Sequence, residues 1–174
     1  MTLFSELYIT PSGFDPLLLT GDETCLTRVD FLQDDRVSYA DLPSPGTYPF
    51  FDNTRLWLDA YFSHRPLPAL PPLRLDGISP FGRKVINLLR EIPYGTLTSY
   101  GALAGRIASE RGIPRMSAQA VGGAVGRNPI CIMIPCHRVI GSDGSLTGFG
   151  GGMKNKIALL RHEGIDPSLY ILPI

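Results

Sequence analysis

The stretch of this 174-residue sequence that decides both the fold and the chemistry is NPICIMIPCHRVIG, residues 128–141. Residues 130–134 are all apolar, which predicts a buried strand or another buried extended segment. This segment runs directly into Pro135, Cys136 and His137, and glycines are dense in the chain that follows. A buried segment before a cysteine and a glycine-rich loop after it indicate a reactive side chain that is held in one place.

Cys136 is the candidate nucleophile. A cysteine reacts as its thiolate, and a free thiol has a pKa of about 8.5, so a nearby base or positive charge is needed. His137 is such a base by position, but neighbouring side chains in an extended chain point in opposite directions. A sharp bend after Pro135 or a bridging water would be required. The alternative is a buried structural cysteine beside a surface histidine and Arg138, and this pattern alone leaves it open.

The other two cysteines, Cys25 and Cys131, lie among apolar or alternating residues, so we expect them to be buried hydrophobic groups. Three cysteines do not make a disulfide framework, and they favour a reducing, intracellular setting. The compact two-domain form of the chain favours the cytoplasm. The sequence has no paired C-x2-C spacing, so we expect no metal and no cofactor. We also expect no membrane span and no signal peptide, because the longest purely apolar run is residues 130–134.

Three helices are predicted ahead of residues 128–141, and each begins at a serine that can cap a helix N-terminus. The three serines are Ser79, Ser99 and Ser117. Short connections separate the helices, which is typical of a helix-turn-helix unit. The third helix, residues 117–125, has mostly small side chains apart from Gln119, and its two central glycines cost about 1 kcal/mol each. That cost predicts either tight packing against a neighbouring helix or close approach of another molecule to the backbone.

The N-terminal part predicts a small β-sheet domain. Residues 6–31 contain short apolar or alternating runs separated by turn signals, which fit a β-meander. Residues 33–49 are polar and contain proline, so they predict a loop, and a short helix is expected over residues 53–62. At the other end of the chain, a helix is predicted over residues 153–163 and is stopped by Gly164.

Charge is distributed unevenly along the chain. The formal net charge is zero, but residues 1–76 carry 11 acidic and 5 basic side chains, whereas residues 77–174 carry 5 acidic and 11 basic ones. Four prolines in residues 66–72 predict a stiff linker close to this change. We therefore predict one domain at residues 1–75 and another at residues 76–174. The basic half favours an anionic partner, the alternative being chance scatter of the charges.

Several motifs together resemble the O6-alkylguanine-DNA alkyltransferases, or methylated-DNA–protein-cysteine methyltransferases, of the bacterial type. The resemblance covers about residues 78–166, and the motifs that carry it are residues 94–100, 120–124, 128–141, 147–152 and 159–164. The N-terminal half, with Thr10-Pro11-Ser12-Gly13, resembles the small ribonuclease-H-like domain of that family. The implied fold class is α/β (α+β): this β-sheet domain precedes a helical domain with a winged helix-turn-helix-like DNA-binding unit.

The resemblance implies DNA repair by direct reversal. The protein would bind alkylated double-stranded DNA as a monomer, with helix 117–125 in the minor groove. It would flip the damaged guanine out of the duplex and transfer the alkyl group from O6 irreversibly to Cys136, and it would also act on O4-alkylthymine. Each molecule would react once, because nothing would cleave the resulting thioether.

The resemblance also implies roles for individual residues. Cys136 matches the nucleophile, His137 the base that ionises it through a water, and Glu163 the carboxylate that orients this histidine. Asn128 matches the hinge that shapes the active-site turn, and Tyr100 the residue that crowds the DNA phosphate and donates a proton to the leaving guanine. DNA contacts are expected from Tyr100, Gln119, Ala120, Gly122, Gly123, Arg127, Arg138 and Ser142. The substrate pocket is expected at Pro135, Phe149, Gly150 and Gly151.

One position departs from the family's pattern. Gln119 lies where the family commonly has the arginine that fills the gap left by the flipped base, so this wedge carries no charge. Two other functions were weighed. A non-catalytic alkyltransferase-like protein that binds lesions would lack the nucleophile, whereas Cys136 is present. A Cys–His hydrolase would turn over many substrate molecules, whereas the alkyltransferase would react once.

Overall fold

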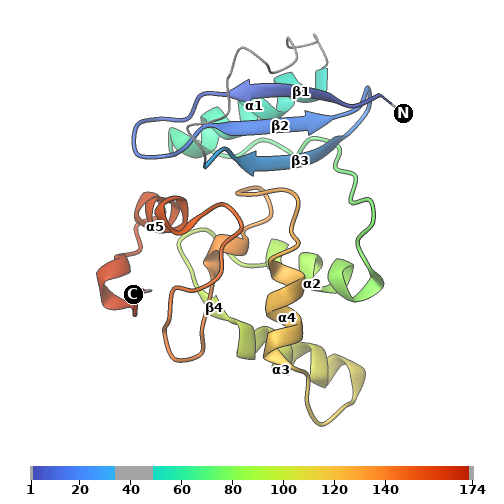
Figure 1. Cartoon of the computed structure of the whole chain (residues 1–174), viewed down its shortest axis with the longest axis vertical. Coiled ribbons are helices and arrows are strands. Elements are labelled where there is room, and N and C mark those ends of the chain that lie inside the picture. Colours follow the sequence, from blue (N-terminus) through green and yellow to red (C-terminus); the bar gives the residue numbers. More distant parts are fainter. Residues whose placement is uncertain (1, 34–48, 173–174) are drawn as a thin grey trace. The chain divides into compact units, whose positions relative to one another are not determined.

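The structure, a computed structural model, describes residues 2–33 and 49–172 (Figure 1). The chain divides into two compact units. The first consists of Met1–Gly77 and Pro129–Cys131, and the second of Ile78–Asn128 and Ile132–Ile174. The division into domains at residues 1–75 and 76–174 stays a prediction, and the break between the compact units falls after Gly77.

The first unit is built on an antiparallel sheet. Its strands are β1 (Phe4–Tyr8), β2 (Leu17–Gly21) and β3 (Leu26–Phe31), in that spatial order. Successive strands pair with each other, so the β-meander predicted over residues 6–31 is confirmed. Side chains alternate between the two faces of the sheet, and Leu17 and Leu19 of the central strand are fully buried.

Helix α1 (Pro49–Phe62) lies across one face of this sheet (Figure 1). Its buried residues include Trp57 and Tyr61, and Tyr8 of β1 donates a hydrogen bond to Asp59 at 2.8 Å. The helix begins four residues before the predicted residue 53, because a proline is well tolerated in the first turn, where its missing N–H has no intrahelical partner. The rest of the loop predicted for residues 33–49 lies outside the described part of the chain.

The proline-rich segment, residues 66–72, contains no helix or strand, as expected of a stiff linker. The chain after it pairs with the sheet. Leu73 forms a parallel bridge with Leu26 of β3, and the N–H of Leu26 donates to the carbonyl of Pro72 at 2.8 Å. The end of the linker is therefore fixed within the first unit.

The apolar segment before Cys136 is buried but forms only one β-bridge. Ile130 pairs with Val29 of β3, which donates to Pro129 O at 2.8 Å and accepts from Cys131 N at 3.0 Å. The chain then turns at Ile132, whose φ is +69°. A β-branched residue rarely adopts this conformation, so the surrounding turn imposes it. The predicted buried extended segment is thus a short bridge followed by a strained turn.

The second unit is mostly helical. Its elements are α2 (Pro80–Arg90), β4 (Thr98–Ser99), α3 (Tyr100–Arg111), α4 (Ala118–Val125), a 3₁₀ turn (Cys136–Arg138), β5 (Val139–Ile140), α5 (Met153–His162) and a second 3₁₀ turn (Pro167–Leu169). The three predicted serine caps are confirmed. The hydroxyls of Ser79, Ser99 and Ser117 accept from backbone N–H groups at 3.1, 3.0 and 3.2 Å. Helix α5 ends within one residue of its predicted end.

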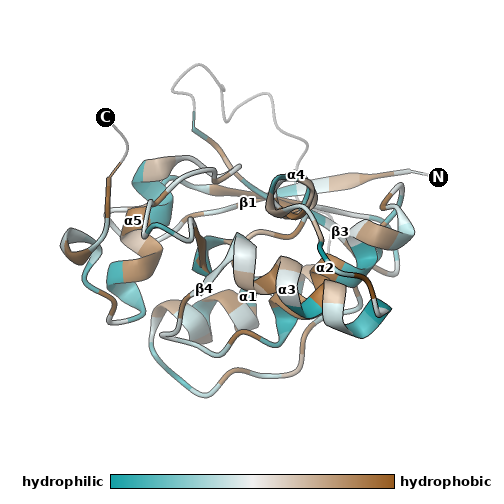
Figure 2. Ribbon diagram, turned by 90° about the horizontal axis from the view of Figure 1, so that it is seen from below, coloured by the Kyte–Doolittle hydropathy of each residue, from teal (hydrophilic) through white to brown (hydrophobic). Residues whose placement is uncertain are grey.

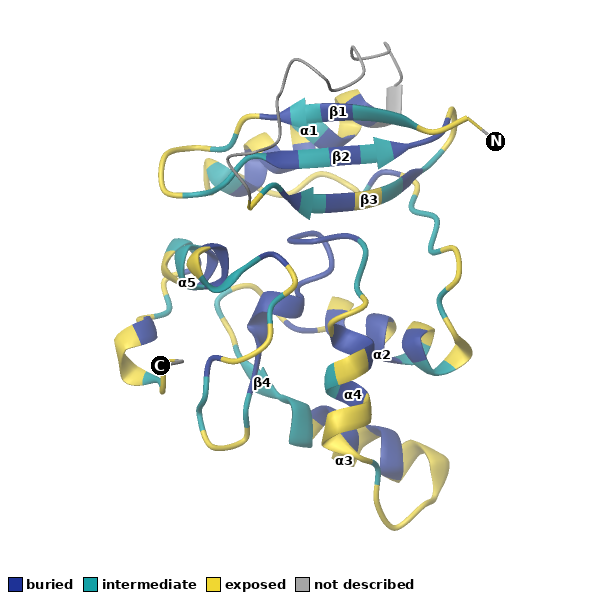
Figure 3. Cartoon of the chain, viewed as in Figure 1, coloured by how far each residue is buried: buried dark blue, intermediate teal, exposed yellow. Residues whose placement is uncertain are grey.

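Helices α2, α3 and α4 each bury one apolar face. The buried side chains include Val85, Leu89, Leu103, Ile107, Val121 and Val125. Figure 2 shows brown and teal stretches alternating around α2 and α3, as this arrangement requires. Figure 3 shows that the opposite face of α4 is exposed, and Gln119, Ala120 and Gly123 lie on it. The exposed face of α4 therefore presents small side chains and one amide.

A short parallel pair of strands links the start of α3 to the chain after Cys136. Thr98 of β4 pairs with Val139 of β5, and Ser99 pairs with Ile140. The sequence analysis did not predict this pair, because two residues are too few to show a period. The pairing places Tyr100, the first residue of α3, beside the segment that carries the candidate nucleophile.

Candidate active site

The chain bends sharply at the nucleophile. Cys136–Arg138 form one 3₁₀ turn, and the N–H of Cys136 donates to Ile134 O at 2.8 Å. Asn128 crosses the base of this turn, because its Nδ2 donates to Ile134 O at 2.8 Å and to the sulfur of Cys136 at 3.0 Å. The chain therefore bends sharply after Pro135, and the side chain of Asn128 contacts both sides of the bend. Cys136 is 5% exposed.

His137 is completely buried and is anchored through one ring nitrogen. Its Nε2 lies 2.8 Å from Oε1 of Glu163. Burial lowers the pKa of His137, and the positive charges of Arg138 and Lys156 lower it further, although the Glu163 carboxylate opposes this. A neutral imidazole that faces an ionised carboxylate must place its proton on Nε2. Nδ1 is then the unprotonated nitrogen, and it has no hydrogen-bond partner among the described residues.

Glu163 accepts from several buried donors at once. Arg138 reaches it with Nε and Nη2, each at 2.8 Å, and Gly95 donates its backbone N–H at 3.1 Å. Burial alone would raise the pKa of Glu163. The hydrogen bonds and charges of His137 and Arg138 outweigh burial, so its pKa lies well below the usual range and the carboxylate is ionised at neutral pH.

The expectation for Arg138 needs correction. A phosphate contact requires an exposed guanidinium, but Arg138 is 7% exposed, and Glu163 and the carbonyl of Ile92 take up its donors. The structure therefore places Arg138 inside the active site rather than on the DNA-facing surface. Arg127, by contrast, is exposed at the end of α4, next to Gly123.

Tyr100 keeps its proton and hydrogen-bonds to the glycine-rich loop. Its hydroxyl lies 3.2 Å from the carbonyl oxygens of both Thr147 and Gly148. Burial raises the pKa of Tyr100, and the negative charge of an ionised Cys136 raises it further. The hydroxyl is therefore a donor throughout the neutral pH range.

An open cavity of about 730 Å³ lies on the second unit, which is within the usual size of ligand sites. Several expected contact residues line it: Tyr100, Gln119, Gly122, Gly123, Ser142, Phe149 and Gly150. Other expected residues lie outside the lining, namely Ala120, Arg127, Pro135, Arg138 and Gly151. Helix α4 and the glycine-rich loop thus face each other across a space large enough for a nucleobase.

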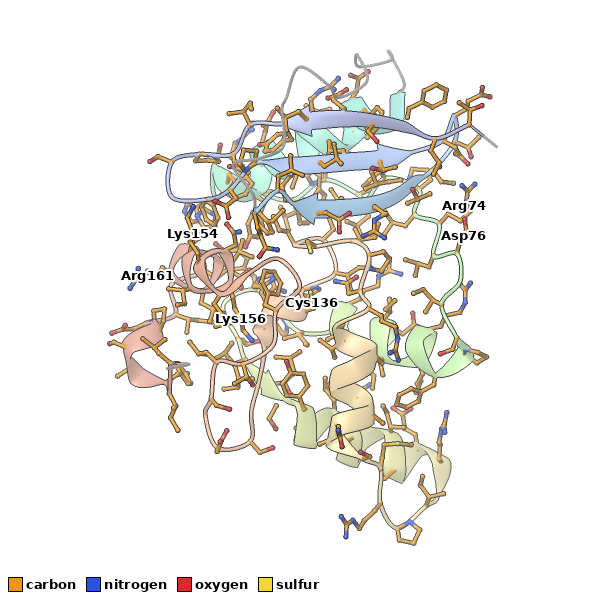
Figure 4. All side chains as sticks on the ribbon, viewed as in Figure 1. Arg74, Asp76, Cys136, Lys154, Lys156 and Arg161 are labelled. Atoms are coloured by element: carbon orange, nitrogen blue, oxygen red, sulfur yellow. The ribbon has the colours of Figure 1, made fainter. Side chains whose placement is uncertain are left out.

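Lys156 is a functional candidate that the sequence analysis missed. It is completely buried in α5, and its Nζ donates to Val139 O at 2.7 Å and to Thr147 O at 3.1 Å. Burial lowers its pKa to about 8, while the negative charge of an ionised Cys136 acts to raise it. Figure 4 labels both residues. The sequence does contain a signal for this buried lysine. Lys156 lies three and four residues before Leu159 and Leu160, on the apolar face of the helix, where a lysine is unusual.

Two further observations bear on the class of protein. Within residues 2–33 and 49–172, no group of three or more His, Cys, Asp or Glu side chains is placed to hold a metal ion. The described helices include none that is long and apolar enough to cross a membrane. A helix-turn-helix unit whose helix α4 lines an open cavity, in the same compact unit as a cysteine held by Asn128, is typical of a protein that binds a large ligand and carries a positioned thiol.

Comparisons with known proteins identify the family. A family model described as the DNA-binding domain of 6-O-methylguanine DNA methyltransferase matches residues 80–165. The methylated-DNA–protein-cysteine methyltransferase of Haemophilus influenzae is 40% identical over 92% of this chain and 88% of its own length. The chain therefore belongs to the methylated-DNA–protein-cysteine methyltransferase family, as the motifs predict.

Solved structures agree with this assignment. The O6-methylguanine methyltransferase of Mycobacterium tuberculosis is 37% identical, with a TM-score of 0.73 over 93% of each chain. The M. tuberculosis protein OGT, solved in complex with DNA, is also 37% identical, with a TM-score of 0.69 over 96% of each chain. The predicted mixed α/β fold class is confirmed, with its small antiparallel sheet and its helices.

Proposed function

We propose that this protein repairs alkylated DNA by direct reversal, moving the alkyl group from O6 of guanine to the sulfur of Cys136. Two pairs of contacts carry this proposal: Asn128 holds the sulfur of Cys136, and Glu163 holds the ring of the adjacent His137. The open cavity lies in the same compact unit. The substrate is double-stranded DNA, and O4-alkylthymine is a second substrate. The protein acts as a monomer in the cytoplasm.

The transfer is a nucleophilic displacement. His137 Nδ1 takes the thiol proton through a bridging water, the bond from sulfur to the alkyl carbon forms, and the bond from that carbon to O6 breaks. The leaving guanine must not carry full negative charge, so the Tyr100 hydroxyl donates its proton to the base, and the proton that His137 took from the thiol returns to Tyr100 through solvent. The thioether on Cys136 is stable in water, so each molecule reacts once.

Helix α4 is the element we assign to the minor groove. Its exposed face bears the small residues Ala120 and Gly123, which let the backbone approach the duplex closely. Gln119 fills the gap that the flipped base leaves, Arg127 contacts a phosphate, and Ser142 lines the opposite wall of the cavity. Flipping costs a few kcal/mol, and less for a poorly paired alkylated base.

The basic excess of the C-terminal half overstates the charge available to DNA. Arg138 and Lys156 are buried, so two of its 11 basic side chains cannot reach a phosphate. Lys84 and Arg106 are engaged in ion pairs with Glu110 and Glu91. We therefore expect modest non-specific affinity, which falls steeply with salt because the remaining contacts are electrostatic.

The proposal is tested by mapping the alkyl group. After incubation with a duplex that contains O6-methylguanine, we expect one methyl group per protein molecule, on Cys136. Cys131 and Cys136 share the tryptic peptide of residues 128–138, so fragment spectra must separate them. A methyl group on Cys131 or Cys25, or repeated turnover, would contradict the proposal. An unmodified protein that still binds the lesion would favour the alkyltransferase-like alternative.

The uncharged wedge gives a separate prediction. We expect Gln119→Arg to tighten binding to duplex DNA several-fold at low salt, because residue 119 is exposed on α4 and an arginine there can reach a phosphate. The slope of the logarithm of affinity against the logarithm of salt concentration should steepen by about 0.9, the value for one added phosphate contact. Anisotropy titrations at several salt concentrations measure both quantities, with Gln119→Met as the uncharged control. Equal slopes for the two variants would show that the wedge needs no charge.

A further inference from the structure

The two oxygens of Glu163 are fully occupied. Oε1 lies 2.8 Å from His137 Nε2 and 2.8 Å from Arg138 Nη2, and Oε2 accepts from Arg138 Nε at 2.8 Å and from Gly95 N at 3.1 Å. A carboxylate offers about four acceptor positions, so these donors saturate it. Arg138 alone supplies two of the four contacts, in the parallel geometry that makes arginine–carboxylate pairs directional.

Arg138 is itself held by the turn that follows α2. Its Nη1 donates to Ile92 O at 2.7 Å, and its guanidinium lies 5.7 Å from the centre of the Tyr94 ring. The hydroxyl of Tyr94 in turn donates to His162 O at 3.1 Å. The turn that carries Ile92 and Tyr94 therefore holds the guanidinium on one side, while Glu163 holds it on the other.

Gly95 completes this turn, and its backbone conformation and close surroundings both favour glycine. Its φ is +70°, which disfavours any residue with a Cβ, and a Cβ at this position would lie 3.0 Å from the carbonyl oxygen of Glu163. With glycine at this position the turn approaches the Glu163 backbone closely and donates to its side chain without strain. The Tyr94-Gly95 motif, which the reaction itself leaves without a role, is thereby explained.

We propose that Arg138, seated by the turn of residues 92–95, is a positioning residue for alkyl transfer. It holds Glu163 ionised and oriented, so that His137 donates through Nε2 and leaves Nδ1 free to accept the thiol proton. The proposal deepens the function proposed above and rests on it. Arg138 does not touch the substrate, and it acts through Glu163 and then through His137.

The physical reason is that burial favours a neutral carboxyl group. Without the guanidinium, Glu163 would lose two donors and its opposite charge, and burial would raise its pKa. A protonated Glu163 could donate to His137 Nε2. The imidazole proton would then move to Nδ1, where it blocks the nitrogen that accepts the thiol proton. Arg138 is needed to exclude this second arrangement.

The test is the pH dependence of single-turnover methyl transfer in the full-length protein. For Arg138→Gln we expect at least a tenfold slower transfer at pH 7, with a rate that recovers as pH rises and Glu163 ionises. Arg138→Lys should recover part of the rate, because it restores the charge but not the paired contacts. Arg106→Gln, which removes an exposed ion-pair partner on α3, is the control and should leave the profile unchanged.

A double-mutant cycle separates positioning from simple stability. If Arg138 acts through Glu163, the rate of Arg138→Gln/Glu163→Gln should equal that of Glu163→Gln alone. Additive losses would overturn the proposal, and so would an Arg138→Gln profile parallel to that of the wild type. Wild-type protein that transfers no methyl group would instead refute the proposed function, which keeps the two failures distinct.

A measurement on the wild-type protein covers the case in which the variants do not fold. Nitrogen-15 histidine spectra should show His137 neutral at pH 7 with its proton on Nε2. A proton on Nδ1, or an imidazolium at pH 7, would overturn the proposal. His64 is exposed, so its signal supplies an internal reference for a solvent-accessible ring.

Discussion

Cys136→Ala abolishes methyl transfer and leaves binding to a duplex with O6-methylguanine within a few-fold of wild type: this is the largest effect we expect. Transfer stops because the sulfur that accepts the alkyl group in the proposed reaction is removed. Binding persists because Cys136 is 5% exposed and is not among the residues that line the cavity. The DNA contacts assigned to α4 do not depend on the sulfur.

The control for this experiment is Cys131→Ala. Cys131 is equally buried, and its backbone N–H, rather than its thiol, makes the bond to Val29. We expect it to keep the full transfer rate, with the modest stability loss of a small truncation. Single-turnover assays with labelled duplex measure transfer, and gel shifts measure binding. Residual transfer by Cys136→Ala would mean that the alkyl group goes to another residue.

Local sequence signals predicted the helix starts well. The hydroxyls of Ser79, Ser99 and Ser117 each accept a hydrogen bond from the backbone N–H three residues later, which would otherwise lack a partner. This interaction involves only four consecutive residues. The stripe of apolar residues likewise predicted which faces of α2 and α3 are buried. Such features depend on residues that are close in the sequence, so they can be predicted from the sequence alone.

Burial of charged groups could not be predicted in the same way. Arg138 follows His137, and the family resemblance implied a DNA contact for it, although most arginines are exposed and this one is buried. Its partners, Glu163 and Ile92, lie 25 and 46 residues away, and only the folded chain brings them together. The resemblance supplied the role of Glu163 but said nothing of what holds Glu163 in place.

Lys156 provides the second large prediction, because it is a buried cation near the nucleophile. With the charge of Glu163 offset by Arg138, Lys156 is the charge that remains to favour the thiolate of Cys136. An opposite charge nearby favours the ionised form of a thiol, so removal of the Lys156 charge should reduce the thiolate population of Cys136. The Lys156 ammonium also holds the carbonyl of Thr147, to which Tyr100 is hydrogen-bonded.

We therefore expect Lys156→Met to slow methyl transfer by about 30-fold at pH 7, a combination of lost charge and a loosened loop. The pH profile should also change. Wild-type transfer should decline above pH 8, where Lys156 loses its proton, whereas the variant should show no decline there. Iodoacetamide alkylation of Cys136 across pH, followed by mass spectrometry, isolates the effect on the thiol from effects on DNA. Identical alkylation profiles would refute the role of the charge.

The Lys156→Met substitution should also change how the free energy of unfolding depends on pH. The pKa of Lys156 is about 8 in the folded protein and about 10.5 in the unfolded chain. Between these values the unfolded state binds the extra proton, so the free energy of unfolding contributed by this group rises with pH, by up to about 3 kcal/mol. Below pH 8 both states are protonated and this contribution is flat. The difference between wild type and Lys156→Met in urea unfolding should therefore grow between pH 8 and 10.5, and parallel curves would show that burial does not lower the pKa of Lys156.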